Sequence, residues 1–140
     1  MMGLILCATR GGEASRRTRD KAIELAKERG DELIFLFVVD MSFMDKTAAA
    51  VVVDAEGGVE KLGEFLLAMA QEHAREKGLE TQVVIREGKT REEIKAAAKE
   101  LEVDCVVLGL PAEEGVFPGE ALRAFAREIE EETGAEVALV

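Results

Sequence analysis

The segment from Gly109 to Glu120 follows an apolar run, in a position that suits a phosphate loop. Binding a phosphate there requires exposed backbone N–H groups and small residues, because the anion must reach the backbone and the positive end of a helix dipole. This segment instead carries carboxylates at Glu113, Glu114 and Glu120. We expect each of them to oppose a phosphate, by about 1–4 kcal/mol at ~4 Å in solvent-like surroundings.

His73 is the only histidine in the sequence, and it is therefore the first candidate for a general base. It continues a helical pattern of apolar residues formed by Leu62, Leu66, Met69 and Ala70. This spacing predicts a packed or half-buried histidine rather than a catalytic one.

The remaining nucleophiles have no catalytic neighbours in the sequence. Ser15 precedes Arg16, and nothing beside it supplies a general base. Cys7 and Cys105 lie on apolar runs without C-x-x-C or zinc-ligand spacing, so we expect buried free thiols. The sequence contains no recognisable triad, metal cluster or nucleophile elbow. It therefore predicts a protein that holds no metal and is not an enzyme, with a weak ATPase activity as the alternative left open.

A basic cluster lies near the start of the first predicted helix. It consists of Arg16, Arg17, Arg19 and Lys21. Arginines in a first helical turn are unfavourable for the helix dipole, which makes an anion site one interpretation. A solvated helix face is the second interpretation. The third is docking onto the acidic last helix of another molecule.

The composition describes a folded and strongly acidic chain of 140 residues, 48% hydrophobic and 34% charged. This length suits one domain, residues 1–140, with a sizeable core. The net charge of −11 argues against nucleic acid as a partner, because phosphate binding needs clustered Lys and Arg. No apolar run approaches the ~20 residues of a membrane span, and no signal peptide is recognisable. We expect a cytoplasmic protein that binds neither nucleic acid nor membrane.

Apolar runs and helical patterns alternate along the chain, which predicts an α/β fold with one doubly wound parallel sheet and helices on both faces. Thr90 and Glu93 have the spacing of a capping box at the start of the third helix, whose apolar pattern reaches Leu101. The predicted strands are Leu4–Thr9, Leu33–Val39, Thr81–Arg86, Cys105–Leu108 and Glu136–Val140, and the other predicted helices are about Glu13–Arg29, Val59–Lys77 and Glu120–Glu132.

Residues 41–58 interrupt this alternation between the second strand and the second helix. They include Met41, Phe43 and Met44 and the run Ala48–Val53, and they are too long for an ordinary connection. An insertion this apolar needs cover. It either folds over the open end of the sheet as extra core, or forms a lid or a partner surface.

Five short stretches, taken in order, carry a family resemblance. They are Cys7-Ala8-Thr9, residues 22–30, Val38-Val39-Asp40, Ile85-Arg86-Glu87-Gly88 and Val106-Val107-Leu108-Gly109. Together they resemble a universal stress protein (UspA-like) domain over nearly the whole chain. The resemblance implies an adenine nucleotide alpha hydrolase-like, Rossmann-like fold with a five-stranded sheet of order 3-2-1-4-5. It also implies a homodimer and, in one branch of the family, an ATP site between the first and fourth strands.

The sequence departs from that nucleotide-binding branch at both of its motifs. The branch has an acidic residue just after the first strand, where this chain has Arg10. Its Gly-x2-Gly-x9-Gly-Ser/Thr motif is matched cleanly only by Gly109, because Ala112 and Glu120 replace the second glycine and the hydroxyl residue. We therefore predict a non-catalytic dimeric interaction or regulatory module without a cofactor. The alternative is a switch that binds ATP or AMP, with or without Mg, through an atypical phosphate loop.

If a nucleotide binds, the resemblance implies a site at the ends of the strands and the start of the last helix. Without a nucleotide, Arg10 either closes this crevice through an ion pair with Glu113 or Glu114, or all three are separately solvated charges. The implied nucleotide-site residues are Thr9, Arg10, Val39, Asp40, Gly88, Gly109, Gly115, Gly119 and Glu120.

The last predicted strand, Glu136–Val140, is expected to join two copies of the chain. It is placed at a sheet edge by the implied strand order, and an edge leaves backbone N–H and C=O groups unpaired. Two such edges can pair antiparallel about a two-fold axis. The predicted partners are thus a second copy of this chain and an unidentified protein.

Overall fold

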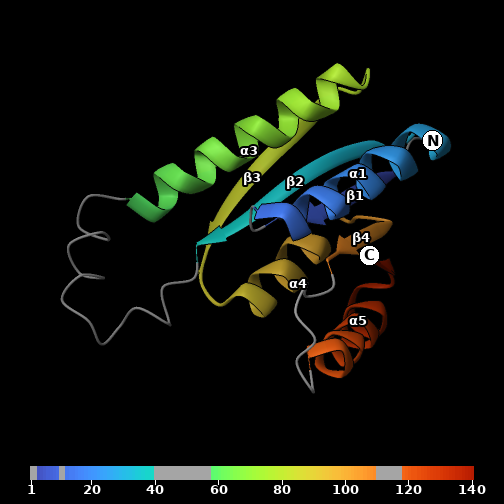
Figure 1. Cartoon of the computed structure of the whole chain (residues 1–140). Coiled ribbons are helices and arrows are strands. Elements are labelled where there is room, and N and C mark those ends of the chain that lie inside the picture. The colour runs from blue at the N-terminus through green and yellow to red at the C-terminus, as the bar shows by residue number, and fades with distance from the viewer. Residues whose placement is uncertain (1–2, 10–11, 40–57, 110–117) are drawn as a thin grey trace.

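Figure 1 shows the computed structural model, which describes residues 3–9, 12–39, 58–109 and 118–140. Five strands form one sheet in the order β3-β2-β1-β4-β5, and every pairing is parallel. The predicted fold class and strand order are therefore confirmed. The strands are β1 (Leu4–Ala8), β2 (Glu32–Val39), β3 (Thr81–Glu87), β4 (Cys105–Leu108) and β5 (Glu136–Leu139), and the helices are α1 (Gly12–Arg29), α3 (Gly58–Glu76), α4 (Thr90–Glu100) and α5 (Pro118–Thr133).

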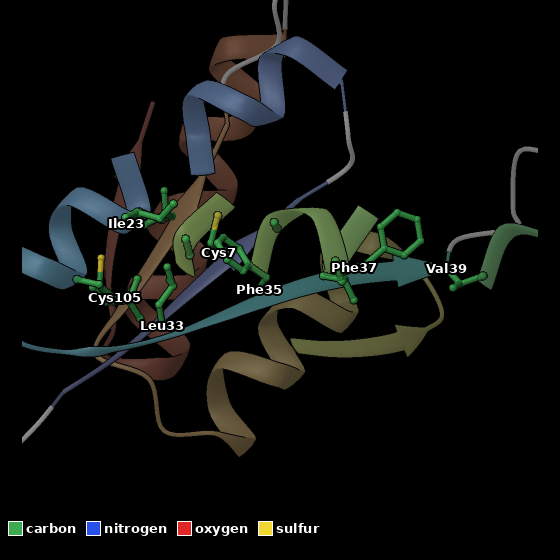
Figure 2. Packing of buried hydrophobic residues seen from close by; sticks show 14 residues of the cluster. Cys7, Ile23, Leu33, Phe35, Phe37, Val39 and Cys105 are labelled. Atoms are coloured by element: carbon green, nitrogen blue, oxygen red, sulfur yellow. The ribbon is translucent and has the colours of Figure 1, made fainter. Parts of the chain in front are cut away.

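Helices α1 and α3 cover one face of the sheet. Strand β1 lies at the centre, since Cys7 is in register with both Phe35 of β2 and Val107 of β4. Figure 2 shows Leu33, Phe35 and Phe37 following one another along β2, with Cys7 beside Phe35, and Ile23 of α1 packs in the same cluster. Covering both faces explains why the central strands are almost continuously apolar.

Helices α4 and α5 cover the opposite face, where Ile94 and Phe125 pack over Leu6 and Leu36. The amino group of Lys95 joins these two helices through ion pairs with Glu128 at 2.7 Å and Glu132 at 3.0 Å. A second tie, Arg29 to Glu136 at 3.1 Å, connects the end of α1 to β5.

The rotation of α3 about its axis differs from the one expected. The buried face of α3 is formed by Gly63, Leu67, Ala70 and Ala74, whereas Leu62 and Met69 of the predicted core stripe are exposed. Gly63 is the cause, because a methyl group there would collide with the ring of Phe37. The helix therefore approaches β2 through its glycine, and this turns Leu62 and Met69 outward.

The start of α4 also corrects a prediction. Lys89 occupies the N-cap position, and it makes no side-chain capping bond. Thr90 is the first helical residue, so the predicted Thr90–Glu93 capping box is wrong. The carboxylate of Glu93 instead accepts a 2.8 Å hydrogen bond from Nε of Arg86 on β3.

The 41–58 insertion lies outside the described residues except for Gly58, which begins α3. Both interpretations of this insertion remain predictions: extra core over the open end of the sheet, or a lid or partner surface. Within the described part of the chain, none of the helices combines the length and apolarity that a membrane crossing requires.

Candidate ligand site at the carboxyl edge of the sheet

Four of the predicted site residues lie along one edge of the sheet. Gly88, Val39, Thr9 and Gly109 end or follow β3, β2, β1 and β4, and these strands are neighbours in that order. Because all the strands are parallel, their carboxyl ends share one edge. The chain order reverses between β1 and β4, which is where α/β sheets of this kind bind ligands.

Backbone hydrogen bonds fix the strand ends at this edge. The N–H of Thr9 donates to the carbonyl of Leu36 at 2.9 Å, and the N–H of Gly88 donates to the carbonyl of Val39 at 3.1 Å. Gly88 has φ +148°, a backbone conformation that favours glycine. These hydrogen bonds therefore hold the carboxyl ends of β1, β2 and β3 in place relative to one another.

The first half of α1 lies directly over the ends of β1 and β4. Thr18 is buried, and a side chain at Gly109 would collide with its hydroxyl group. The β1–β4 register, extended by two residues from Cys7 and Val107, places Thr9 beside Gly109. Because Gly109 has no side chain, α1 can pack closely against the end of β4, and this is a structural reason for a glycine at this position.

Two buried side-chain atoms at this end of the molecule have no hydrogen-bond partner among the described residues. They are Oγ1 of Thr9, whose residue is 3% exposed, and Nε of Arg19, whose residue is 9% exposed. Among the described residues, no ion pair forms with Arg19. A buried guanidinium nitrogen without a hydrogen-bond partner is costly. An anionic group at this end of the molecule would supply the partner that both atoms lack among the described residues.

The positive charge of Arg19 acts on a buried neighbouring group, the thiol of Cys7. Burial raises the pKa of the Cys7 thiol to about 12, and the nearby Arg19 charge opposes that rise. Cys7 and Thr9 lie two residues apart at the end of one strand, so their side chains point to the same face of the sheet. Arg19 therefore lies on the α1 side of β1, the side to which Thr9 also points.

The structure places six of the nine predicted site residues. Gly119 and Glu120 lie in the first turn of α5, where Glu120 is exposed. Arg10, Asp40 and Gly115 lie outside the described residues, together with Glu113 and Glu114 of the predicted crevice ion pair.

Sequence reasoning placed Arg19 in a basic cluster with an anion site as one interpretation, but it missed the burial of Arg19 and did not single out Thr18. Arg16 and Arg17 are exposed as a solvated face predicts, but Arg19 is buried. A signal was present, because Arg19 lies three and four residues before Ala22 and Ile23 on the buried stripe of α1.

Comparison with known proteins decides the family. The universal stress protein family profile matches residues 1–117. The chain belongs to this family. Universal stress protein YxiE from Bacillus subtilis is 30% identical over 117 residues, which are 78% of this chain and 79% of that protein.

Solved structures of universal stress proteins share the fold. One from Burkholderia pseudomallei has a TM-score of 0.72 at 22% identity and covers 99% of this chain and 95% of that one. Another, from Archaeoglobus fulgidus in complex with dAMP, has a TM-score of 0.61 at 15% identity and covers 99% and 97%. At these identities the likeness concerns the fold alone.

The single histidine of this universal stress protein lies away from the strand ends and joins two helices. Nε2 of His73 on α3 lies 2.6 Å from Oδ1 of Asp20 on α1, and Nζ of Lys77 lies 3.4 Å from the same oxygen. His73 is half-buried, as predicted. Burial alone raises the pKa of Asp20, but the hydrogen bonds from His73 and Lys77 outweigh it, and the net shift is downward.

Replacing Asp20 by Asn is expected to weaken the acid sensitivity of the fold. A carboxyl group whose pKa is lower in the folded state contributes stability above its unfolded pKa and loses it as pH falls through the folded value. The free energy of unfolding should therefore fall less steeply below about pH 4 in Asp20→Asn than in the parent protein. Urea unfolding across this range measures the slope, with Glu131→Gln as an exposed control. Equal slopes in parent and Asp20→Asn would contradict the prediction.

Metal chemistry finds no support in the described residues of this universal stress protein. They contain no group of three or more His, Cys, Asp or Glu side chains placed to hold an ion. Cys7 and Cys105 are buried and free, as predicted. Burial also raises the pKa of Cys105, so neither thiol is activated.

Proposed function

We propose that this universal stress protein is a non-catalytic regulatory module that acts as a homodimer joined through β5. The observation that carries the proposal is the direction of the β5 backbone. The N–H of Glu136 donates to the carbonyl of Asp104, just before β4, at 2.9 Å, and the N–H of Val140 donates to the carbonyl of Leu108 at 3.0 Å. Because backbone groups alternate along a strand, the N–H and C=O groups of Val137 and Leu139 point away from the sheet.

The side chains of β5 are also only partly covered. Val137 and Leu139 pack against the α4–α5 side of the core, and Ala138 and Val140 pack against the α1–α3 side, all at intermediate burial. In an antiparallel pair of β5 edges about a two-fold axis, Val137 of one copy faces Leu139 of the other. Such a pair extends both faces of the sheet across the interface.

Proline at position 139 is expected to separate the dimer without unfolding the protomer. It removes an N–H that points outward, and edge strands tolerate proline on that side. Light scattering at low micromolar concentration should then report the protomer mass for Leu139→Pro and the dimer mass for Leu139→Ala. The alanine variant is the matched control, because it shortens the same side chain and keeps the N–H.

Ala138→Pro provides the opposite control. Position 138 faces β4, so proline there removes a hydrogen bond of the protomer's own sheet and should lower the melting temperature. A parent protein that is already monomeric, or a Leu139→Pro protein that remains dimeric, would contradict β5 as the interface.

A second candidate function is an adenine-nucleotide switch, favoured by the Thr9 hydroxyl and the Nε of Arg19, which have no partner among the described residues. Both fit an anionic group of a ligand at the strand ends. The carboxylate of Glu120 in the first turn of α5 does not fit a phosphate, because it occupies the helix end that would attract one. A ligand would therefore be held from the α1 side. The dAMP complex of the Archaeoglobus fulgidus protein is consistent with this second function.

Calorimetric titration with Mg-ATP and with AMP decides between the two functions. For the regulatory module we expect no binding, or dissociation constants in the millimolar range, since the net charge of −11 also repels a triphosphate at low salt. A dissociation constant below ~10 μM, equivalent to about 7 kcal/mol, would establish the nucleotide switch instead.

A further inference from the structure

Large apolar side chains are exposed in one place on the described surface. Leu62, Phe65 and Met69 of α3 are 52%, 60% and 49% exposed, and Val83 of the neighbouring strand β3 is 39% exposed. Val83 lies two residues before Ile85, which packs on the α1–α3 side, so it shares the α3 face of the sheet. We name Leu62, Phe65 and Met69 the α3 stripe.

The α3 stripe is not needed to hold the helix on the sheet. The opposite side of α3 packs through Gly63, Leu67, Ala70 and Ala74, all buried against the core. Spacings of three and four residues within the α3 stripe match the seam of paired helices. Such a row of exposed side chains marks an interaction surface.

The charged residues beside the α3 stripe indicate that a second copy of the chain covers it. At 100° per residue, Lys61 and Glu72 lie on the same flank of the stripe, at opposite ends of the helix. Two antiparallel helices bring the same flanks together, so Lys61 of one copy lies opposite Glu72 of the other. The same arrangement places Phe65 opposite Met69. A parallel pair would instead place this flank of one copy against the other flank of its partner, so Lys61 and Glu72 would not meet.

We propose that α3 is a second self-association surface, at which the α3 stripes of two copies pack antiparallel about a two-fold axis near Leu67. The Phe65–Met69 and Lys61–Glu72 pairings both place the axis there. The aliphatic part of Lys61 covers apolar surface while its charge faces Glu72, which already pairs with Arg75 at 3.0 Å.

This surface is independent of the β5 dimer. Strand β3 and α3 lie at one edge of the sheet, and β5 lies at the other. Because α3 extends about 28 Å at 1.5 Å per residue, a helix pair of this size is a small interface, and we expect a weak association on the order of 100 μM. Two different two-fold interfaces on one chain build assemblies larger than a dimer.

Cross-linking through a single new cysteine tests the geometry. Ala68 is exposed and lies beside the proposed axis, and both native cysteines are buried. With a short bismaleimide, Ala68→Cys should form covalent dimers efficiently at high micromolar concentration. Adding Phe65→Ser should reduce the yield about tenfold. Arg127→Cys, exposed on α5, is the matched control and should remain uncross-linked.

Sedimentation velocity of the Leu139→Pro protein provides the second measurement. Its sedimentation coefficient should rise with concentration, and Phe65→Ser should abolish the rise. Equal cross-linking of Ala68→Cys with and without Phe65→Ser would overturn the proposal. So would a large loss of protomer stability in Phe65→Ser, because it would show that the α3 stripe is covered within one chain.

Discussion

Phe35→Ala is expected to lower the free energy of unfolding by about 3–5 kcal/mol, which approaches the whole stability of many small domains. Phe35 is fully buried at the centre of β2, in register with Cys7 on one side and Val83 on the other. Removing its ring takes away the largest fully buried side chain of the α1–α3 side and leaves a cavity that the parallel strands cannot close.

Phe65→Ala is the matched control for this measurement. The chemical change is identical, but Phe65 is 60% exposed on α3, so the protomer should lose less than about 1 kcal/mol. Urea unfolding at low protein concentration measures both variants without contributions from self-association. Equal destabilisation by the two substitutions would show that Phe65 is part of the core, and would also contradict the α3 surface.

Arg19→Met is expected to raise the free energy of unfolding by about 1–4 kcal/mol. The guanidinium is buried, its Nε is unpartnered, and it has no ion pair among the described residues. Methionine has a similar length and removes the cost of the buried charge. Arg17→Met, on the exposed side of the same helix, is the control and should change stability by less than about 0.5 kcal/mol.

The same variant tests the second candidate function. If an anionic group belongs beside Thr9 and Arg19, AMP should raise the melting temperature of the parent protein but not of Arg19→Met. If the protein is only a regulatory module, AMP should leave both unchanged. A loss of stability in Arg19→Met without any nucleotide would contradict the prediction, because it would show that the guanidinium already has a counter-charge.

The order of strands and helices was predictable because it depends on local pattern. Apolar runs such as the one in β2 and the helical spacing in α5 are properties of neighbouring residues, and parallel crossovers then limit the topology. The family resemblance supplied the strand order, which the structure confirms. From these, the meeting of Thr9 and Gly109 at one sheet edge follows directly.

The candidate site was only partly predictable for a geometric reason. Helical periodicity states which side chains share a face, but it does not state how the helix is rotated against the sheet. Contact between Gly63 and Phe37 decides that rotation for α3 and exposes Leu62 and Met69. The approach of Thr18 to Gly109 places the first half of α1 over the strand ends, where Arg19 is buried.

Sequence alone thus determined the α/β class, the order of the elements and the apolar content of the sheet, since these depend on residues close together in the chain. Tertiary structure decided which charge is buried, which apolar row faces solvent, and that Leu139 rather than Ala138 points its N–H out of β5. Each of these depends on contacts between elements distant in sequence. No local pattern encodes them.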